Sequence, residues 1–265
     1  GVINLISAGG YDIFIAKLNN AGAWQWAAKA GGTANDLSLA LAVDSSENCY
    51  ITGYFNGTAT FGTTNLTSTD FFYDVFVAKV NNTGAWEWAI RAGNTSYDQG
   101  YGIAVDSSGN SYITGSFRET ATFGTVTLTS AGDNDIFVAK LNNTGAWQWA
   151  VRAGGTLADS GYAIAVDASG NSYITGDFSG TATFGTINLT SAGTIDMFVA
   201  KLNNVGAWQW ALRTGGSADD RGRAITVDMS GNCYIAGEFS GTATFGTTNL
   251  TSAGYLDVFV AKYGR

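Results

Sequence analysis

The sequence predicts an all-β protein, and more specifically a β-propeller made of four-stranded antiparallel blades. Three observations predict it. A unit of about 61 residues recurs along the 265-residue chain, apolar residues alternate within each unit, and tight turns of Asx and glycine separate the apolar runs.

The repeat is clearest at a Trp-x-Trp pair, whose first residue recurs at spacings of 62, 61 and 61, at Trp24, Trp86, Trp147 and Trp208. Copies of Ala-Thr-Phe-Gly end at Gly62, Gly124, Gly185 and Gly246. The prediction is a single propeller over residues 1–265, with repeat units of approximately 1–61, 62–123, 124–184 and 185–245 and a partial unit over 246–265. Because Gly1 aligns with the repeated glycines, the chain begins inside a repeat, and we expect it to be a segment of a longer array.

Each unit contains four strand candidates, which we name by their expected order from the centre outward. The inner strand lies around 39–43, the second around 48–55, the third around 12–18 and the outer around 23–30. Side chains alternate with a period of two in these runs, as in a half-buried strand. The turns 44–47 and 19–22 pair an Asx residue with a glycine or its equivalent and fit tight hairpins.

A lone sheet cannot cover both of its faces, so tandem copies are expected to pack on one another as propeller blades or as a stack. Small residues such as Ala40 and Ala42 in the inner strand suit crowding at a central axis, which favours the propeller. The paired tryptophans of the outer strand suit the wider space between splayed blades. Burial of each aromatic side chain contributes roughly 1.5–3 kcal/mol, so these rings explain cohesion without a ligand.

The repeated string Ile-Ala-Val-Asp-x-Ser-Gly-Asn-x-Tyr-Ile-Thr-Gly-x-Phe-Ser-Gly-Thr-Ala-Thr-Phe-Gly, followed by Asp-Ile-Phe-Val-Ala-Lys-Leu-Asn, resembles the SBBP family of bacterial β-propeller repeats. Residues 154–203 carry it most cleanly. The resemblance implies a propeller, proposed as seven-bladed, in large secreted or surface-attached bacterial proteins. It implies no catalytic residues.

The chain has too few repeats for seven blades, which leaves two ways to close the ring. In one, the inner and second strands near the C-terminus pair with the third and outer strands near the N-terminus and close a four-bladed ring. One strand of the third type is then left over, either 12–17 or 257–262. Alternatively, a larger ring is completed by other residues or by another chain.

Composition excludes several function classes. The chain has no His, only 2 Cys, a net charge of −8 and 13 Lys and Arg. Nucleic acid and anionic lipid are therefore poor partners, and no apolar run is long enough for membrane insertion. Without a histidine, a phosphate-binding glycine loop or a cysteine with a base, we expect a non-enzyme that needs no cofactor and no metal.

Strand directions place the long connections, such as 56–73, on one face and the tight turns on the other. On this long-connection face, each unit brings together two aspartates and a cation, as in Asp12, Lys29 and Asp36. An ion-pair network is the favoured interpretation, and a calcium site is the alternative. Asp44 and its equivalents are interpreted as turn formers on the opposite face.

Positions where otherwise similar repeats disagree are the candidate ligand-binding residues. At the entrance of the inner strand, Leu37 corresponds to Gln99, Ser160 and Arg221, and Leu39 to Tyr101, Tyr162 and Arg223. A channel mouth lined by Tyr101 and Tyr162 on one side and Arg221 and Arg223 on the other is suited to an asymmetric ligand. Relaxed constraint at an exposed site is the simpler explanation.

The tryptophans allow two roles. If exposed, Trp24, Trp86, Trp147 and Trp208 are sugar-stacking platforms repeated once per blade; if buried, they pack blades together, which we favour. Cys49 and Cys233 replace serines of other repeats and are expected to be buried free thiols rather than a disulfide.

The leading functional hypothesis is a non-catalytic extracellular module that acts as a scaffold or adhesin in a larger bacterial surface assembly. Its partners would be a protein, a surface glycan or other repeats of the same assembly. The alternative is a multivalent, lectin-like carbohydrate-binding propeller.

Overall fold

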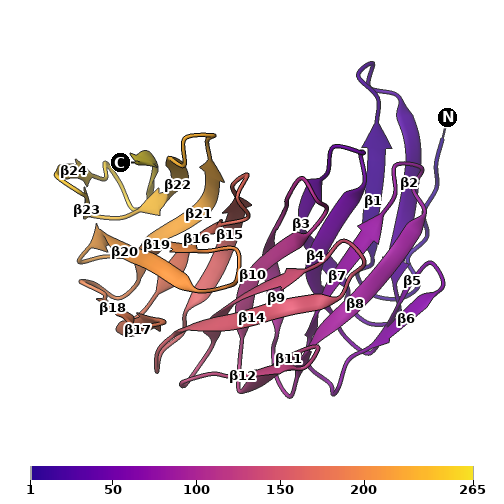
Figure 1. Cartoon of the computed structure of the whole chain (residues 1–265), viewed down its shortest axis with the longest axis horizontal. Coiled ribbons are helices and arrows are strands. Elements are labelled where there is room, and N and C mark those ends of the chain that lie inside the picture. The colour runs from indigo at the N-terminus through magenta and orange to yellow at the C-terminus, as the bar shows by residue number, and fades with distance from the viewer. Residues whose placement is uncertain (1, 265) are drawn as a thin grey trace.

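The computed structural model describes residues 2–264 and consists of strands joined by turns and loops. No helix long and apolar enough to cross a membrane occurs in these residues. The sheets fan out in an arc, with the N-terminal and C-terminal sheets on opposite sides (Figure 1).

The four predicted strands per unit are present and pair antiparallel in the predicted order. The inner strands are β3 (Leu37–Val43), β9 (Gln99–Val105), β15 (Ser160–Val166) and β21 (Asp220–Val227). The second strands are β4 (Cys49–Phe55), β10 (Ser111–Phe117), β16 (Ser172–Phe178) and β22 (Cys233–Phe239). The third strands are β1 (Ile13–Leu18), β7 (Asp74–Val80), β13 (Asp135–Leu141), β19 (Asp196–Leu202) and β25 (Asp257–Tyr263). The outer strands are β2 (Trp24–Gly31), β8 (Trp86–Asn94), β14 (Trp147–Gly154) and β20 (Trp208–Gly216).

The prediction placed no strand in the long connection between second and third strands, and this part of it is wrong. The connection contains a short hairpin in each unit: β5 (Thr58–Phe61) with β6 (Thr64–Thr67), β11 (Thr120–Phe123) with β12 (Val126–Thr129), β17 (Thr181–Phe184) with β18 (Ile187–Thr190), and β23 (Thr242–Phe245) with β24 (Thr248–Thr251). The hairpin bonds to the nearest outer strand before it in the chain, as β11 does with β8 at Asn94. Four-stranded units therefore grow into six-stranded sheets such as β12-β11-β8-β7-β4-β3, and the hairpin ties neighbours together.

The inner strands of successive units lie side by side, β3 against β9, β9 against β15, and β15 against β21. The small residues predicted for this region allow the close approach: Gly102 faces the backbone of Tyr162 so closely that a Cβ would lie 2.9 Å from its carbonyl oxygen. Apolar side chains of the second, third and outer strands fill the space between neighbouring sheets.

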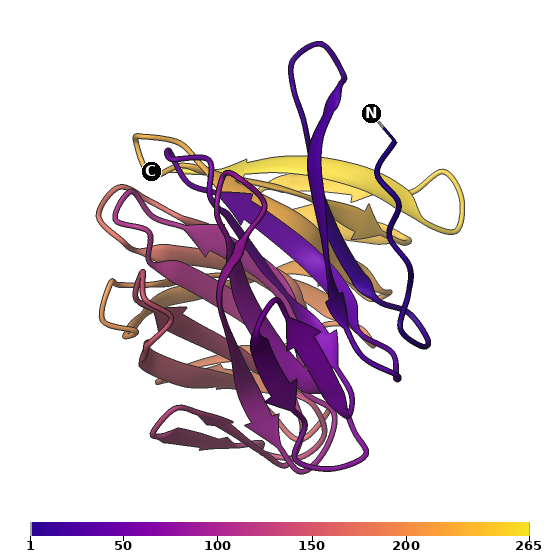
Figure 2. The same cartoon turned by 90° about the vertical axis from the view of Figure 1, so that its right-hand side faces the viewer.

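Both ends of the arc are open. Strand β1 pairs with β2 and with no second strand in the described residues, and β25 pairs with β22 and with no outer strand. Phe14 on β1 is 68% exposed, whereas its equivalents Phe76, Phe137 and Phe198 are fully buried. Val258 on β25 is 86% exposed, whereas its equivalent Val75 is buried. The first alternative for closing the ring is therefore not adopted, because β22 pairs with β25 rather than with β1. In Figure 2 the β1–β2 hairpin (indigo) projects at the edge of the molecule.

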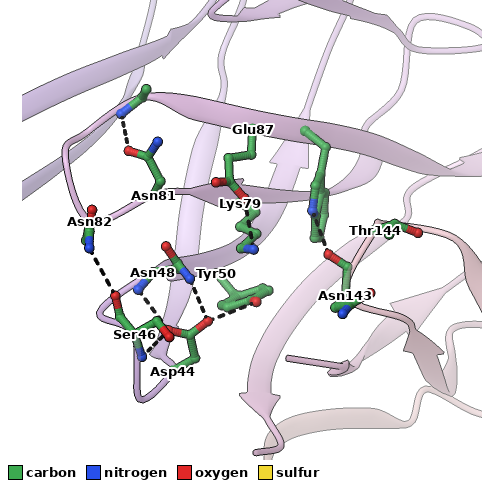
Figure 3. Close-up of polar contacts among 12 residues, drawn as sticks. Asp44, Ser46, Asn48, Tyr50, Lys79, Asn81, Asn82, Glu87, Asn143 and Thr144 are labelled. Carbon is green, nitrogen blue, oxygen red and sulfur yellow. Dashed lines mark hydrogen bonds and ion pairs between the residues drawn. The ribbon is translucent and has the colours of Figure 1, made fainter. Parts of the chain in front are cut away.

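Asp44 and its equivalents stabilise the tight turns between inner and second strands, as predicted. Asp44 Oδ1 accepts the amides of Ser46 and Asn48, each at 2.9 Å, and Oδ2 accepts the Tyr50 hydroxyl at 3.2 Å (Figure 3). Although burial opposes ionisation, hydrogen bonds from Asn48, Ser46 and Tyr50 together lower the pKa of Asp44. The same bonds recur at Asp106, Asp167 and Asp228.

Candidate functional site

The variable positions at the entrance of the inner strands coincide with a β-bulge in every unit. The pairing of inner and second strands skips one residue each time, and the skipped residues are Leu39, Tyr101, Tyr162 and Arg223. A bulge residue leaves the regular alternation, so its side chain can be aimed away from the sheet face. These four side chains therefore leave the sheet at the same point of their inner strands.

Three of these side chains form a continuous row. The rings of Tyr101 and Tyr162 lie with centroids 5.6 Å apart, and the guanidinium of Arg223 lies 4.7 Å from the centroid of Tyr162. A cation over an aromatic face is attracted by the ring quadrupole. The structure therefore brings together the tyrosines and one of the arginines that the sequence singled out.

The arginine end of the row is a compact ion network. Arg221 lies 3.2 Å from Asp177, 3.2 Å from Asp219 and 3.8 Å from Glu238, and Arg223 lies 2.6 Å from Glu238. The hydroxyl of Tyr162 donates to Asp177 Oδ2 at 3.1 Å. We call Tyr101, Tyr162, Arg221 and Arg223, with Asp177 and Glu238, the entrance cluster.

The acidic members of the entrance cluster were missed by sequence reasoning, although a signal existed. Asp177 and Glu238 lie directly opposite Ser160 and Arg221 on the second strand. The equivalent residues in the other units are Tyr54 and Ser116. This position therefore varies among the repeats as strongly as the inner-strand positions do, and the same comparison of repeats would have found it.

Burial governs ionisation in the entrance cluster. It raises the pKa of Asp177 despite the opposing hydrogen bond from Tyr162 and the charge of Arg221. Burial, with the negative charge of Asp177, raises the pKa of Tyr162 to about 12, so this phenol stays protonated at neutral pH. The cluster can therefore donate and accept hydrogen bonds and pair charges.

The repeated charges of the long-connection face form ion pairs in three units, as the favoured interpretation predicted. Asp74 pairs with Arg91 at 2.9 Å, and the equivalent pairs are Asp135–Arg152 and Asp196–Arg213. Lys29 instead donates to the backbone of Ile6. The second aspartate of each set, such as Asp98, is buried and accepts a backbone amide rather than pairing with the cation. No group of three or more acidic, Cys or His side chains suited to a metal occurs in residues 2–264.

The tryptophans lie between neighbouring units. The ring of Trp86 stands edge-on to Phe61 with centroids 5.2 Å apart, and Trp147 and Trp208 repeat this contact with Phe123 and Phe184. These three are half-buried, whereas Trp24 at the open end is 52% exposed. This placement favours packing over sugar stacking. Cys49 and Cys233 are free thiols, as predicted, but only Cys233 is buried, and Cys49 is half-buried.

Repeats and structure together define a β-propeller repeat protein. Two segments, residues 87–116 and 148–177, match the family model of the SBBP β-propeller repeat. These two matches confirm the resemblance to SBBP repeats found in the sequence. Each matched segment runs from an outer strand through the inner strand to the second strand that follows it in the chain.

Two curated proteins are similar to the chain. An uncharacterised WD repeat-containing protein of Acanthamoeba polyphaga mimivirus is 27% identical over 95% of this chain. The regulatory protein FlaEY of Caulobacter vibrioides is 25% identical over 50% of it. The matched regions make up 23% and 14% of these longer proteins. Among solved structures, a Bacteroides caccae protein of unknown function shows 10% identity and a TM-score of 0.46, covering 93% of this chain and 72% of its own.

Proposed function

We propose that this chain is a non-catalytic β-propeller module, with units of about 61 residues over 1–265, that serves as a scaffold by joining other repeats edge to edge. In this proposal it is a segment of a longer propeller or repeat array on the surface of a bacterium. The family resemblance supports the bacterial surface location.

The observation that carries the proposal is the pair of open sheet edges. Phe14 and Val258 occupy positions that neighbouring strands bury elsewhere in the same chain. The inner-strand residues Leu39, Leu41 and Val43 beside β1 are also exposed, and Leu41 corresponds to the buried Ile103. An unpaired strand with an apolar face is a template for pairing with another strand. The chain itself shows the matching partner, since β10 covers β13 with seven paired residues.

A role in binding proteins agrees with the name of the mimivirus relative, which is described as containing WD repeats. The entrance cluster is a second contact region on the long-connection face. The alternative is a lectin-like module in which the tryptophans stack on sugars. It receives less support, because three of their rings pack against phenylalanines of the neighbouring hairpin.

Self-association tests the proposal. We expect the purified chain to associate with rising concentration in light-scattering chromatography, because β1 and β25 each present an unpaired edge and an exposed apolar face to another copy. Phe14→Glu should abolish this association by placing a charge on the open edge. Met229→Glu, at a turn residue that is 99% exposed, is the matched control and should leave association intact. A chain that stays monomeric at all concentrations contradicts the proposal.

Two further measurements test the remaining parts. Labelling of intact host cells with a membrane-impermeant reagent should reach the protein if it lies on the surface. A screen of glycosides and esters should give no turnover, and any specific activity that survives purification would contradict the non-catalytic role.

A further inference from the structure

One loop on the long-connection face breaks the repeat. Five residues separate Ser68 from Asp74, whereas four separate the equivalent residues in each other unit, as between Ser130 and Asp135. The longer loop contains three consecutive aromatic residues, Phe71, Phe72 and Tyr73. The extra residue adds no strand, so the fold does not require it.

Phe72 and Tyr73 of this loop join two more rings, Tyr54 and Tyr97, in one cluster. Phe72 and Tyr97 have centroids 4.7 Å apart, Tyr97 and Tyr73 5.8 Å, and Tyr73 and Tyr54 4.6 Å. Tyr97 corresponds to Asn35, Ala158 and Asp219 in the other units, and Tyr54 to Ser116, Asp177 and Glu238. The cluster therefore occurs once among the repeats, and a packing requirement common to all repeats does not explain it.

The cluster borders a hollow of about 360 Å³, within the usual size range of small-molecule sites. The rings of Phe71, Tyr73 and Tyr97 line it together with the polar residues Thr33, Asn35 and Asn56. Phe71 is 97% exposed, and Tyr97 is also exposed. No charged side chain is among the lining residues.

Hydrogen bonds within the protein fix the conformation of the loop between Ser68 and Asp74. The side-chain Nδ2 of Asn56 donates to the carbonyl oxygens of Phe71 and Phe72, at 2.7 and 2.8 Å. Asp70 Oδ1 accepts the Phe72 amide at 2.8 Å, and Ser68 Oγ donates to the Asp70 carbonyl at 2.9 Å. Binding therefore requires little ordering of the loop, which lowers its entropic cost.

We propose that this hollow binds a neutral oligosaccharide. A sugar ring presents apolar C–H faces and a rim of hydroxyl groups. The exposed rings of Phe71 and Tyr97 can cover the apolar faces. Asn35 Nδ2, Asn56 Oδ1 and the Tyr73 hydroxyl can bond the sugar hydroxyl groups, since Asn35 Oδ1 and Asn56 Nδ2 already bond the backbone. A charged ligand would be buried without a counter-charge in this lining, which is unfavourable. The site goes beyond the scaffold role and does not use the open edges.

The repeats themselves supply the test variants. Tyr97→Ala installs the residue that the third unit has at Ala158, and Tyr73→Asn installs the equivalent of Asn134. Tyr255→Ala is the matched control, because Tyr255 is an exposed ring in the equivalent loop of the last unit. Thermal unfolding of each variant checks that the fold is retained.

The experiment titrates the chain with neutral hexasaccharides of glucose, xylose, mannose and N-acetylglucosamine, followed by calorimetry and NMR shifts. We expect at least one to bind, with affinity about tenfold weaker in Tyr97→Ala and unchanged in Tyr255→Ala. The proposal is overturned if none binds at millimolar concentration, if only charged sugars or peptides bind, or if Tyr97→Ala binds as tightly as the parent. Loss of self-association in Phe14→Glu is a separate result and leaves this test unaffected.

Discussion

The indole of Trp26 lies against Gly84 of the following unit, so closely that a Cβ on this glycine would come within 2.8 Å of the ring. Trp26 Nε1 also donates to the carbonyl oxygen of Asn82 at 2.9 Å. The contact recurs for Trp88 at Gly145 and for Trp149 at Gly206. In these three pairs the second tryptophan of an outer strand contacts the turn between the next third and outer strands, and Figure 3 shows Asn143 in one such turn.

Gly84→Ala is therefore expected to destabilise the chain for two reasons. The residue has φ of 87°, where a Cβ costs roughly 1–2 kcal/mol, and the new methyl group strikes Trp26. Gly22→Ala is the matched control, because Gly22 has φ of 75° but no atom within 4 Å of the added Cβ. Chemical unfolding should show a larger loss for Gly84→Ala. Equal losses would mean that the Trp26 contact contributes nothing.

Stability should fall as pH rises from about 4 to about 8. Burial, with the nearby charge of Asp74, raises the pKa of Asp98 from 3.8 to about 8, so the folded chain binds a proton that the unfolded chain lacks in this window. The stability that this proton provides is complete below pH 4 and is lost as pH rises through 8. Burial raises the pKa of Asp159 to about 7, which acts in the same direction.

Asp98→Asn tests this assignment. The variant should be less sensitive to pH between 5 and 9 than the parent in urea unfolding, and relatively more stable at pH 9. Below pH 4 the turn carboxylates oppose the trend, because hydrogen bonds lower the pKa of Asp106 and its stabilisation is lost on protonation. An unchanged pH slope in Asp98→Asn would place the titrating group elsewhere.

Arg221→Leu replaces an arginine of the entrance cluster with leucine, the residue that the first unit has at the equivalent position, Leu37. We expect a loss of about 1–3 kcal/mol, because the buried Asp177 loses a charged partner at 3.2 Å. Arg118→Leu removes an exposed pair with Asp133 at 3.6 Å and should cost less than about 1 kcal/mol. Denaturant titration compares the two variants. Equal effects would show that the cluster adds no stability of its own.

Sequence reasoning predicted the repeat, the strand order and the turn role of Asp44, because these depend on local periodicity and on hydrogen bonds within a few residues. It missed the hairpin of β5 and β6, since two four-residue strands in a Thr-rich connection carry little alternation. It also missed Asp177, Glu238 and the aromatic hollow. A comparison of the repeats could have marked the positions of Asp177 and Glu238 as variable. Their contacts, like that of Tyr73 with Tyr97, join different strands and loops and follow only from the fold.

Hydrogen exchange of the third strands tests the central claim most directly, because β1, β7, β13, β19 and β25 have nearly the same sequence in different surroundings. The account predicts slow exchange of amides in β7, β13 and β19, which have strands on both sides, and faster exchange in β1 and β25, which each have one free edge. Uniformly slow exchange in all five strands of an isolated monomer would contradict the open edges. Uniformly fast exchange would contradict packing of the units on one another.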